Sequence, residues 1–128
     1  MPGGGVALLR SIAALADLHL EGDEKTGLNI LKAALEKPIK QIAENAGVDG
    51  AVVAEEVKKH QGSFGFNAET MQYEDLIQSG IIDPTKVVRS ALENSTSAAA
   101  MILTTEAVVA EKEEKKENSG MPNMGMGY

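Results

Sequence analysis

Residues 81–103, with the sequence IIDPTKVVRSALENSTSAAAMIL, carry the strongest helix signal in the 128-residue chain. Asp83 stands where an N-cap residue is expected, and Pro84 follows at the first helical position, where its missing N–H is not needed. Apolar side chains, most of them small, then recur at helical spacing. The sequence therefore predicts a helix that Asp83 caps and that another helix can approach closely.

The segment after this helix, TTEAVVAEK at residues 104–112, is rich in β-branched residues and predicts a strand. No partner strand lies nearby in the sequence, so we expect it to pair outside this chain. Residues 111–128 combine a charged run with a Gly/Met-rich end and cannot bury enough apolar surface to become ordered. We expect one domain over residues 1–110 and a disordered tail over 111–128.

The segment before the helix, GSFGFNAETMQYEDL at residues 62–76, alternates glycines with aromatic residues and predicts a small β-hairpin. Phe64 and Phe66 point to one side of its first strand, and Asn67 favours the turn. The return strand reaches Tyr73, and residues 73–80, YEDLIQSG, are expected to form a short helix that stops at a glycine.

The first 60 residues predict three helices. Residues 6–19 are apolar nearly all round and should be buried on most sides. Residues 26–45 carry an apolar stripe, with a kink expected at Pro38. Residues 49–60 begin at Asp49, which suits an N-cap. The fold class is therefore all-α, mainly helical, with a small hairpin and a strand that pairs elsewhere.

The composition excludes several classes of function. A net charge of -7 argues against a nucleic-acid partner, since binding to phosphates needs clustered Lys and Arg. Charged residues interrupt every apolar stretch well short of a bilayer span, so a membrane partner is not expected. The absence of cysteine excludes disulfides and thiolate zinc sites. His19 and His60 have no ligand-spaced companions, so no metal site is expected.

The chain begins MPGGGVALLR, a glycine run that feeds a helix. Such a turn can hold a phosphate, but on its own it more often serves as a tight turn. Asp83 alone is explained as a helix cap, and Asn67 alone as a turn residue. No pattern of residues indicates a catalytic nucleophile, so no catalytic residue is assigned.

Taken in order, four stretches resemble the C-terminal end of a GroEL-type (group I) chaperonin subunit. They are GGGVALLR, NAG, the long stretch GFNAETMQYEDLIQSGIIDPTKVVRSALENSTSAAAMILTTEAVV, and the Gly/Met-rich end. The resemblance covers residues 2–128 but matches only about the last quarter of such a subunit. It implies the C-terminal half of the equatorial domain, the helical domain that binds ATP and makes most ring contacts.

The resemblance also implies roles for individual residues. The glycine turn would lie against the nucleotide, with its middle glycine closest. The Asn-Ala pair of the hairpin would approach the adenine. An isoleucine would line the base pocket, and an aspartate would bind the ribose hydroxyls. The ATP-binding residues implied are, in that order, Gly3, Gly4, Gly5, Asn67, Ala68, Ile81 and Asp83. Only glycine lets a backbone approach a nucleotide so closely, and an ionised carboxylate accepts from two hydroxyls.

The sequence departs from the family pattern in ways that bear on catalysis. The Asp-Gly-Thr-Thr loop that holds phosphate and magnesium is absent, as is the aspartate that positions the attacking water. ATP with Mg²⁺ and K⁺ is the cofactor set of the intact family, but the metal ligands are not in this chain. The resemblance implies that the intact family is an ATPase. Because phosphoryl transfer depends on these groups for electrostatic stabilisation, we expect the isolated chain to be inactive. Glu69 also stands where alanine is frequent.

The assembly expected by resemblance is a homo-oligomeric double ring that works with a co-chaperonin on unfolded client proteins. Contacts between subunits are implied at Lys40, Asp49, Thr105, Glu106 and Val108. The expected location is the bacterial cytoplasm, with the mitochondrial matrix or chloroplast stroma as the alternative. The alternative function is an autonomous helical interaction module that binds no nucleotide.

Overall fold

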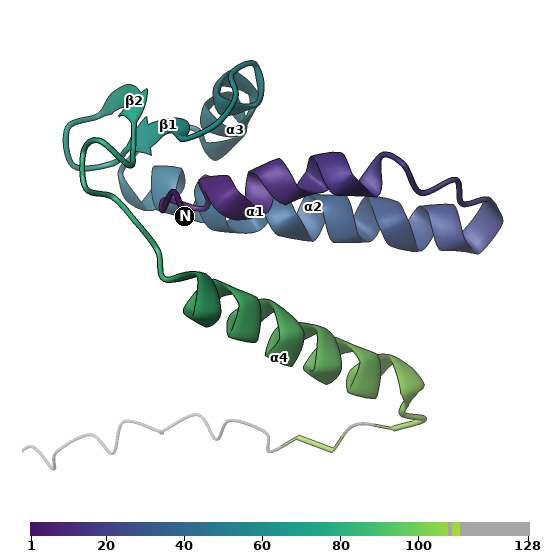
Figure 1. Ribbon diagram of the computed structural model, residues 1–128. Coiled ribbons are helices and arrows are strands. Elements are labelled where there is room, and N and C mark those ends of the chain that lie inside the picture. Colours follow the sequence, from purple (N-terminus) through teal and green to yellow (C-terminus); the bar gives the residue numbers. More distant parts are fainter. Residues whose placement is uncertain (108, 111–128) are drawn as a thin grey trace, which may run out of the picture.

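The fold is known from a computed structural model that describes residues 1–107 and 109–110. It is mainly helical with one small antiparallel hairpin, which confirms the predicted fold class (Figure 1). In chain order the elements are α1 (Val6–Ser11), the 3₁₀ helix η1 (Ile12–Leu15), α2 (Gly22–Asn45), α3 (Gly50–Lys58), β1 (Phe64–Asn67), β2 (Gln72–Asp75) and α4 (Thr85–Thr104).

The first predicted helix is shorter than the apolar pattern indicated. Residues 6–11 are α-helical, 12–15 tighten into a 3₁₀ turn, and the chain then leaves the helix before His19. The expectation of burial on most sides is wrong beyond α1, because no side chain of η1 is buried. Because η1 buries little apolar surface, tertiary packing does little to continue the α-helix through these residues. Short 3₁₀ turns are common at the ends of α-helices.

The long helix α2 begins at Gly22, one turn earlier than the sequence predicted, and continues through Pro38 to Asn45. Asp23 and Glu24 lie in its first turn, where negative charge is favourable against the helix dipole. α1 lies along α2, and α3 crosses its C-terminal part (Figure 1). The crossing is close, because a Cβ on Gly50 would lie 2.6 Å from the carbonyl oxygen of Lys40.

The hydrophobic core forms where α1, α2, α3 and the hairpin meet. The part of the fold that precedes α4 is called the body. Its core residues come from α1, α2, α3, β1 and the position after β2, and they form one buried cluster: Val6, Leu9, Ile39, Ala43, Val53, Ala54, Val57, Phe66 and Leu76. The hairpin is joined to this core by Phe66 on β1 and Leu76 just after β2. The predicted hairpin is confirmed, with Phe64 opposite Asp75 and Asn67 opposite Gln72.

The short helix predicted over residues 73–80 is wrong. Residues 72–75 form β2, and a single turn follows. The Asp75 carboxylate closes this turn by accepting hydrogen bonds from the backbone N–H groups of Ile77 and Gln78, at 3.0 and 3.1 Å. Gly80, with φ +76°, then ends it. Aspartate favours such local bonds over a continuing helix, and here it anchors a turn.

α4 differs from the other helices because none of its side chains is buried. It leaves the body after Pro84 and lies apart from α2 (Figure 1). Its N-cap is Pro84 with extended backbone, so the prediction that Asp83 caps this helix is wrong. The strand predicted over 104–112 is not formed at residues 105–107 and 109–110, and its pairing outside this chain stays a prediction. Val108 and the predicted tail, 111–128, lie outside the described residues.

Candidate nucleotide site

The beginning of the chain pairs with the segment that leads into α4. Pro2 and Ile82 form an antiparallel bridge. The backbone N–H of Gly3 donates to the carbonyl oxygen of Ile81, and the N–H of Asp83 donates to that of Met1, both at 3.0 Å. Two segments about 80 residues apart in sequence are thereby held side by side, and the resemblance had assigned residues of both to one ATP pocket.

Gly3 lies against the Asp83 side chain. A Cβ on Gly3 would lie 3.3 Å from Oδ1 of Asp83 and 3.2 Å from the Ile81 side chain. Asp83 is half-buried, and among the described residues its carboxylate takes part in no hydrogen bond or ion pair. It is therefore available to accept hydrogen bonds from a ligand, as a ribose contact requires. Ile81 is partly buried and packs against the core.

Gly4 and Gly5 both have left-handed backbone, with φ of +64° and +77°. A Cβ on Gly4 would lie 3.7 Å from the carbonyl oxygen of Phe66, so the turn approaches the hairpin one residue before Asn67. A Cβ on Gly5 would lie 2.7 Å from the backbone nitrogen of Ile39 on α2. Gly5 is thus required by helix packing as well as by its φ angle.

Asn67 is 6% exposed, and both polar atoms of its side chain form hydrogen bonds within the hairpin. Its Nδ2 donates to Glu74, and its Oδ1 accepts from the N–H groups of Glu69 and Thr70. The interpretation of Asn67 as a turn residue is confirmed. Ala68 beside it is half-buried against the core.

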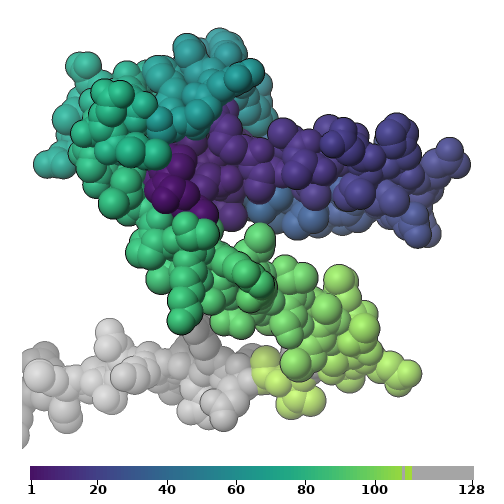
Figure 2. All heavy atoms as spheres, viewed as in Figure 1, coloured from purple at the N-terminus to yellow at the C-terminus, as the bar shows by residue number. Residues whose placement is uncertain are grey.

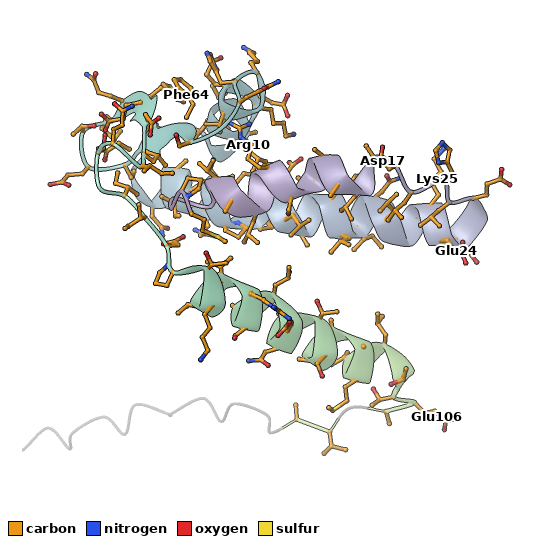
Figure 3. The ribbon with its side chains drawn as sticks, in the orientation of Figure 1. Arg10, Asp17, Glu24, Lys25, Phe64 and Glu106 are labelled. Atoms are coloured by element: carbon orange, nitrogen blue, oxygen red, sulfur yellow. The ribbon has the colours of Figure 1, made fainter. Side chains whose placement is uncertain are left out.

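Arg10 is a residue of this region that the sequence reasoning did not assign. Its guanidinium lies between α1, α3 and the hairpin, where it donates to three backbone carbonyl oxygens (Figure 3). Burial lowers the pKa of Arg10 from its ordinary value, and the group stays charged at neutral pH. One signal was present: Arg10 is the single cation in an otherwise apolar helix, and such a cation needs partners.

Two of the residues assigned to subunit contacts are engaged within this chain. Lys40 pairs with Glu36, which also binds Lys58, each at 2.7 Å. These bonds, first that of Lys40 and then that of Lys58, hold the pKa of Glu36 below its ordinary value. Asp49 caps α3, as predicted, by accepting from the N–H groups of Ala51 and Val52. Thr105 and Glu106 follow α4 and are exposed.

An apolar groove of about 650 Å³ separates α4 from the body, and Figure 2 shows the hollow between them. Asp83 and Pro84 lie at the end of this groove, next to the glycine turn. Its walls are formed mainly by small and aliphatic side chains of α2 and α4, among them Leu31, Ala34, Pro38, Val88, Ala91 and Ser95. The candidate nucleotide site and the groove therefore share the segment that connects α4 to the body.

Two further observations concern residues 1–107 and 109–110 only. No three His, Asp or Glu side chains converge there in a way that could hold a metal ion. None of the helices in this part combines the length and hydropathy that a membrane-spanning helix needs.

Comparison with known proteins identifies the family. Residues 1–113 match the model of the TCP-1/cpn60 chaperonin family, and the chain belongs to this family. Among solved structures, it is similar to the open-state monomer of a group II chaperonin from Methanococcoides burtonii, with 26% sequence identity and a TM-score of 0.75. The match covers 82% of this chain and 28% of that one, so the chain spans little more than a quarter of the length of this solved relative.

Proposed function

We propose that this chain serves as part of an ATP-dependent chaperonin and supplies one wall of the ATP pocket. The observation that carries the proposal is that Gly3 lies beside the carboxylate of Asp83, which binds no other group among the described residues, and that the backbone pairing of residues 1–3 with 81–83 holds the two together. A glycine turn without side chains, beside a carboxylate that can accept hydrogen bonds, fits the sugar and phosphates of a nucleotide.

In the proposed site each residue has a distinct task. Asp83 accepts hydrogen bonds from the ribose hydroxyls, Gly3, Gly4 and Gly5 allow close approach, and Ile81 with the backbone at Asn67 and Ala68 borders the base. Mg²⁺ and K⁺ would neutralise the phosphates when bound, and the Asp-Gly-Thr-Thr loop that holds phosphate and magnesium in the family by resemblance does not occur in this sequence. This chain binds and orients the nucleotide, and the rest of the subunit completes the catalytic site.

The apolar groove supports the proposal that this chain acts together with the rest of a subunit. No α4 side chain is buried, so nothing in the described residues fixes the helix firmly against α2. A segment of the remaining subunit that fills the groove would hold α4 in place and close the nucleotide pocket beside Asp83.

We further propose a group I subunit that assembles into a double ring, works with a co-chaperonin and encloses unfolded client proteins in the bacterial cytoplasm. A mitochondrial matrix or chloroplast stroma location is the alternative. The support is the group I pattern of the motifs GGGVALLR and GIIDPTKVVRSAL. Membership of the chaperonin family favours this reading over an autonomous interaction module.

The experiment is a nucleotide-binding measurement on a graft, in which this chain replaces the matching segment of a group I chaperonin subunit. The unchanged graft is expected to bind Mg-ATP. Asp83→Ala should weaken binding by about tenfold to a hundredfold, since it removes hydrogen bonds to a charged acceptor. Asp17→Ala, at an exposed position beyond η1, is the control and should leave the affinity unchanged. Equal affinities for all three proteins would contradict the assignment of Asp83.

A further inference from the structure

We propose that Arg10 is a positioning residue for the nucleotide site, which holds the glycine turn and the hairpin turn at a fixed separation. This inference rests on the proposed function, because it concerns the same pocket. Arg10 forms no hydrogen bond with Asp83 or with the glycine turn, Gly3–Gly5, so it would act through the elements that carry them.

The contacts of Arg10 span three parts of the fold. Nη1 donates to the carbonyl oxygen of Val57 at 2.9 Å, near the C-terminal end of α3. Nε donates to Gly62 at 3.2 Å, in the loop that follows, and Nη2 donates to Phe64 at 3.1 Å, the first residue of β1. Figure 3 shows Arg10 on α1 facing α3 and the segment that bears Phe64.

These bonds need the shape of a guanidinium. Its donors lie in one rigid plane and reach three carbonyl oxygens at once, whereas a lysine ammonium is a single point of charge. Two of the three contacts are partly buried, so the carbonyls at Val57 and Phe64 would lose a partner away from bulk water if Arg10 were removed. Lysine at this position can restore the charge but not the threefold contact.

The elements that Arg10 joins carry the two sides of the proposed pocket. α1 begins directly after Gly5, and Arg10 lies one turn beyond Val6 on the same short helix. β1 begins at Phe64 and ends at Asn67, and the carbonyl oxygen of Phe66 borders Gly4. A shift of β1 along α1 therefore changes the distance between the glycine turn and Asn67–Ala68, where the nucleotide would lie.

Side-chain packing also joins α1 and β1, but it constrains a shift of β1 along α1 less than hydrogen bonds do. A Cβ on Gly65 would lie 2.5 Å from the Val6 side chain, so α1 and β1 are in close contact. Apolar contact of this kind is not directional, whereas three hydrogen bonds from one planar group fix both separation and angle. Arg10 is the one side chain of α1 that hydrogen-bonds α3, the loop and β1 among the described residues.

The test compares Arg10→Lys and Arg10→Met in the grafted subunit by titration with Mg-ATP. Arg10→Met should weaken ATP binding at least about fivefold, at a temperature where the protein is fully folded, and Arg10→Lys should recover part of the loss. Val53→Ala, a truncation in the core of α3, matches the loss of stability without touching the carbonyl contacts. Arg89→Met removes an exposed arginine of α4 and controls for charge.

The outcomes separate a positioning role from a structural one. If Val53→Ala weakens ATP binding as much as Arg10→Met at an equal loss of melting temperature, Arg10 acts only through stability and the proposal is wrong. Failure of the unchanged graft to bind ATP overturns the proposed function instead. In that case amide hydrogen exchange of the chain alone tests the role of Arg10. Arg10→Met, but not Val53→Ala, should speed exchange both at Val6 and at Glu69–Thr70. Unchanged exchange at these positions in Arg10→Met would overturn the proposal.

Discussion

Gly3 and Ile81 are joined by a backbone hydrogen bond of 3.0 Å, although 77 residues lie between them. The bond sets the N-terminal glycine turn beside the segment that ends in Asp83. The same segment is the only covalent connection between the body and α4. A ligand that bridges Gly3 and Asp83 would therefore also influence where α4 lies.

Substitution at Gly5 should destabilise the fold far more than substitution at another left-handed glycine. Gly5→Ala combines the strain of φ +77° with a Cβ that would lie 2.7 Å from the Ile39 nitrogen, so we expect a loss of about 2–4 kcal/mol in the free energy of unfolding. Gly22→Ala, at φ +57° with open space around it, should cost only about 1 kcal/mol. Urea denaturation measures both, and equal losses would show that the α1–α2 contact can relax.

Features that depend on neighbouring residues could be predicted from the sequence better than features that depend on tertiary packing. The hairpin and the Asp49 cap follow from residues within a few positions of each other, and both predictions are confirmed. The helix predicted at 73–80 failed because the Asp75 side chain closes a turn there. The approach of Gly5 to Ile39 depends on how two helices pack, and no periodicity in the sequence encodes it.

The candidate site was predicted to a different degree at each residue. The pairing of Gly3 with Ile81 and Asp83 could be expected only from the family resemblance, since each residue alone had an ordinary structural explanation. Arg10 was missed because its three acceptors are backbone carbonyls, and these have no identity in a sequence. A lone cation in an apolar helix indicates that partners exist without indicating which they are.

Acid should weaken the α2–α3 contact through Glu36. Because the bonds from Lys40 and Lys58 hold its pKa in the folded state below the ordinary 4.5, ionised Glu36 stabilises the fold above that pH. The contribution is lost as the pH falls through the lowered folded value. Glu36→Gln should therefore lower the free energy of unfolding by about 1 kcal/mol at pH 7 and flatten its decline in acid.

The control for Glu36 is an ion pair of the same kind on the surface. Glu93→Gln breaks the exposed pair with Arg89 on α4 and should change the free energy of unfolding by less than about 0.5 kcal/mol at any pH. Denaturant titrations from pH 3 to 7 compare the variants with the unchanged chain. A decline in acid as steep for Glu36→Gln as for the unchanged chain would assign the acid sensitivity to other carboxylates.

α4 should be the least protected helix when the chain is studied alone. None of its side chains is buried, and most of the stability of a helix in a protein comes from tertiary packing of its apolar face. Amide hydrogen exchange should therefore be fast across residues 87–100 and slow in α2 around Ile39, which is almost fully buried. Similar protection in both helices would mean that α4 is held by contacts beyond those described.

Filling the groove from the α4 side should block association with the rest of a subunit. Ala91→Phe places a large ring among the groove residues, whereas Ala100→Phe lies nine residues on, on the opposite face of α4. Both positions are exposed, so both variants should keep the free energy of unfolding of the chain within about 0.5 kcal/mol.

Isothermal titration of the chain with the N-terminal half of a chaperonin equatorial domain measures the association. Binding should be at least about tenfold weaker for Ala91→Phe, which corresponds to the 1–3 kcal/mol typical of overpacking. Binding unchanged by Ala91→Phe, or weakened equally by Ala100→Phe, would show that this half-domain does not pack in the groove.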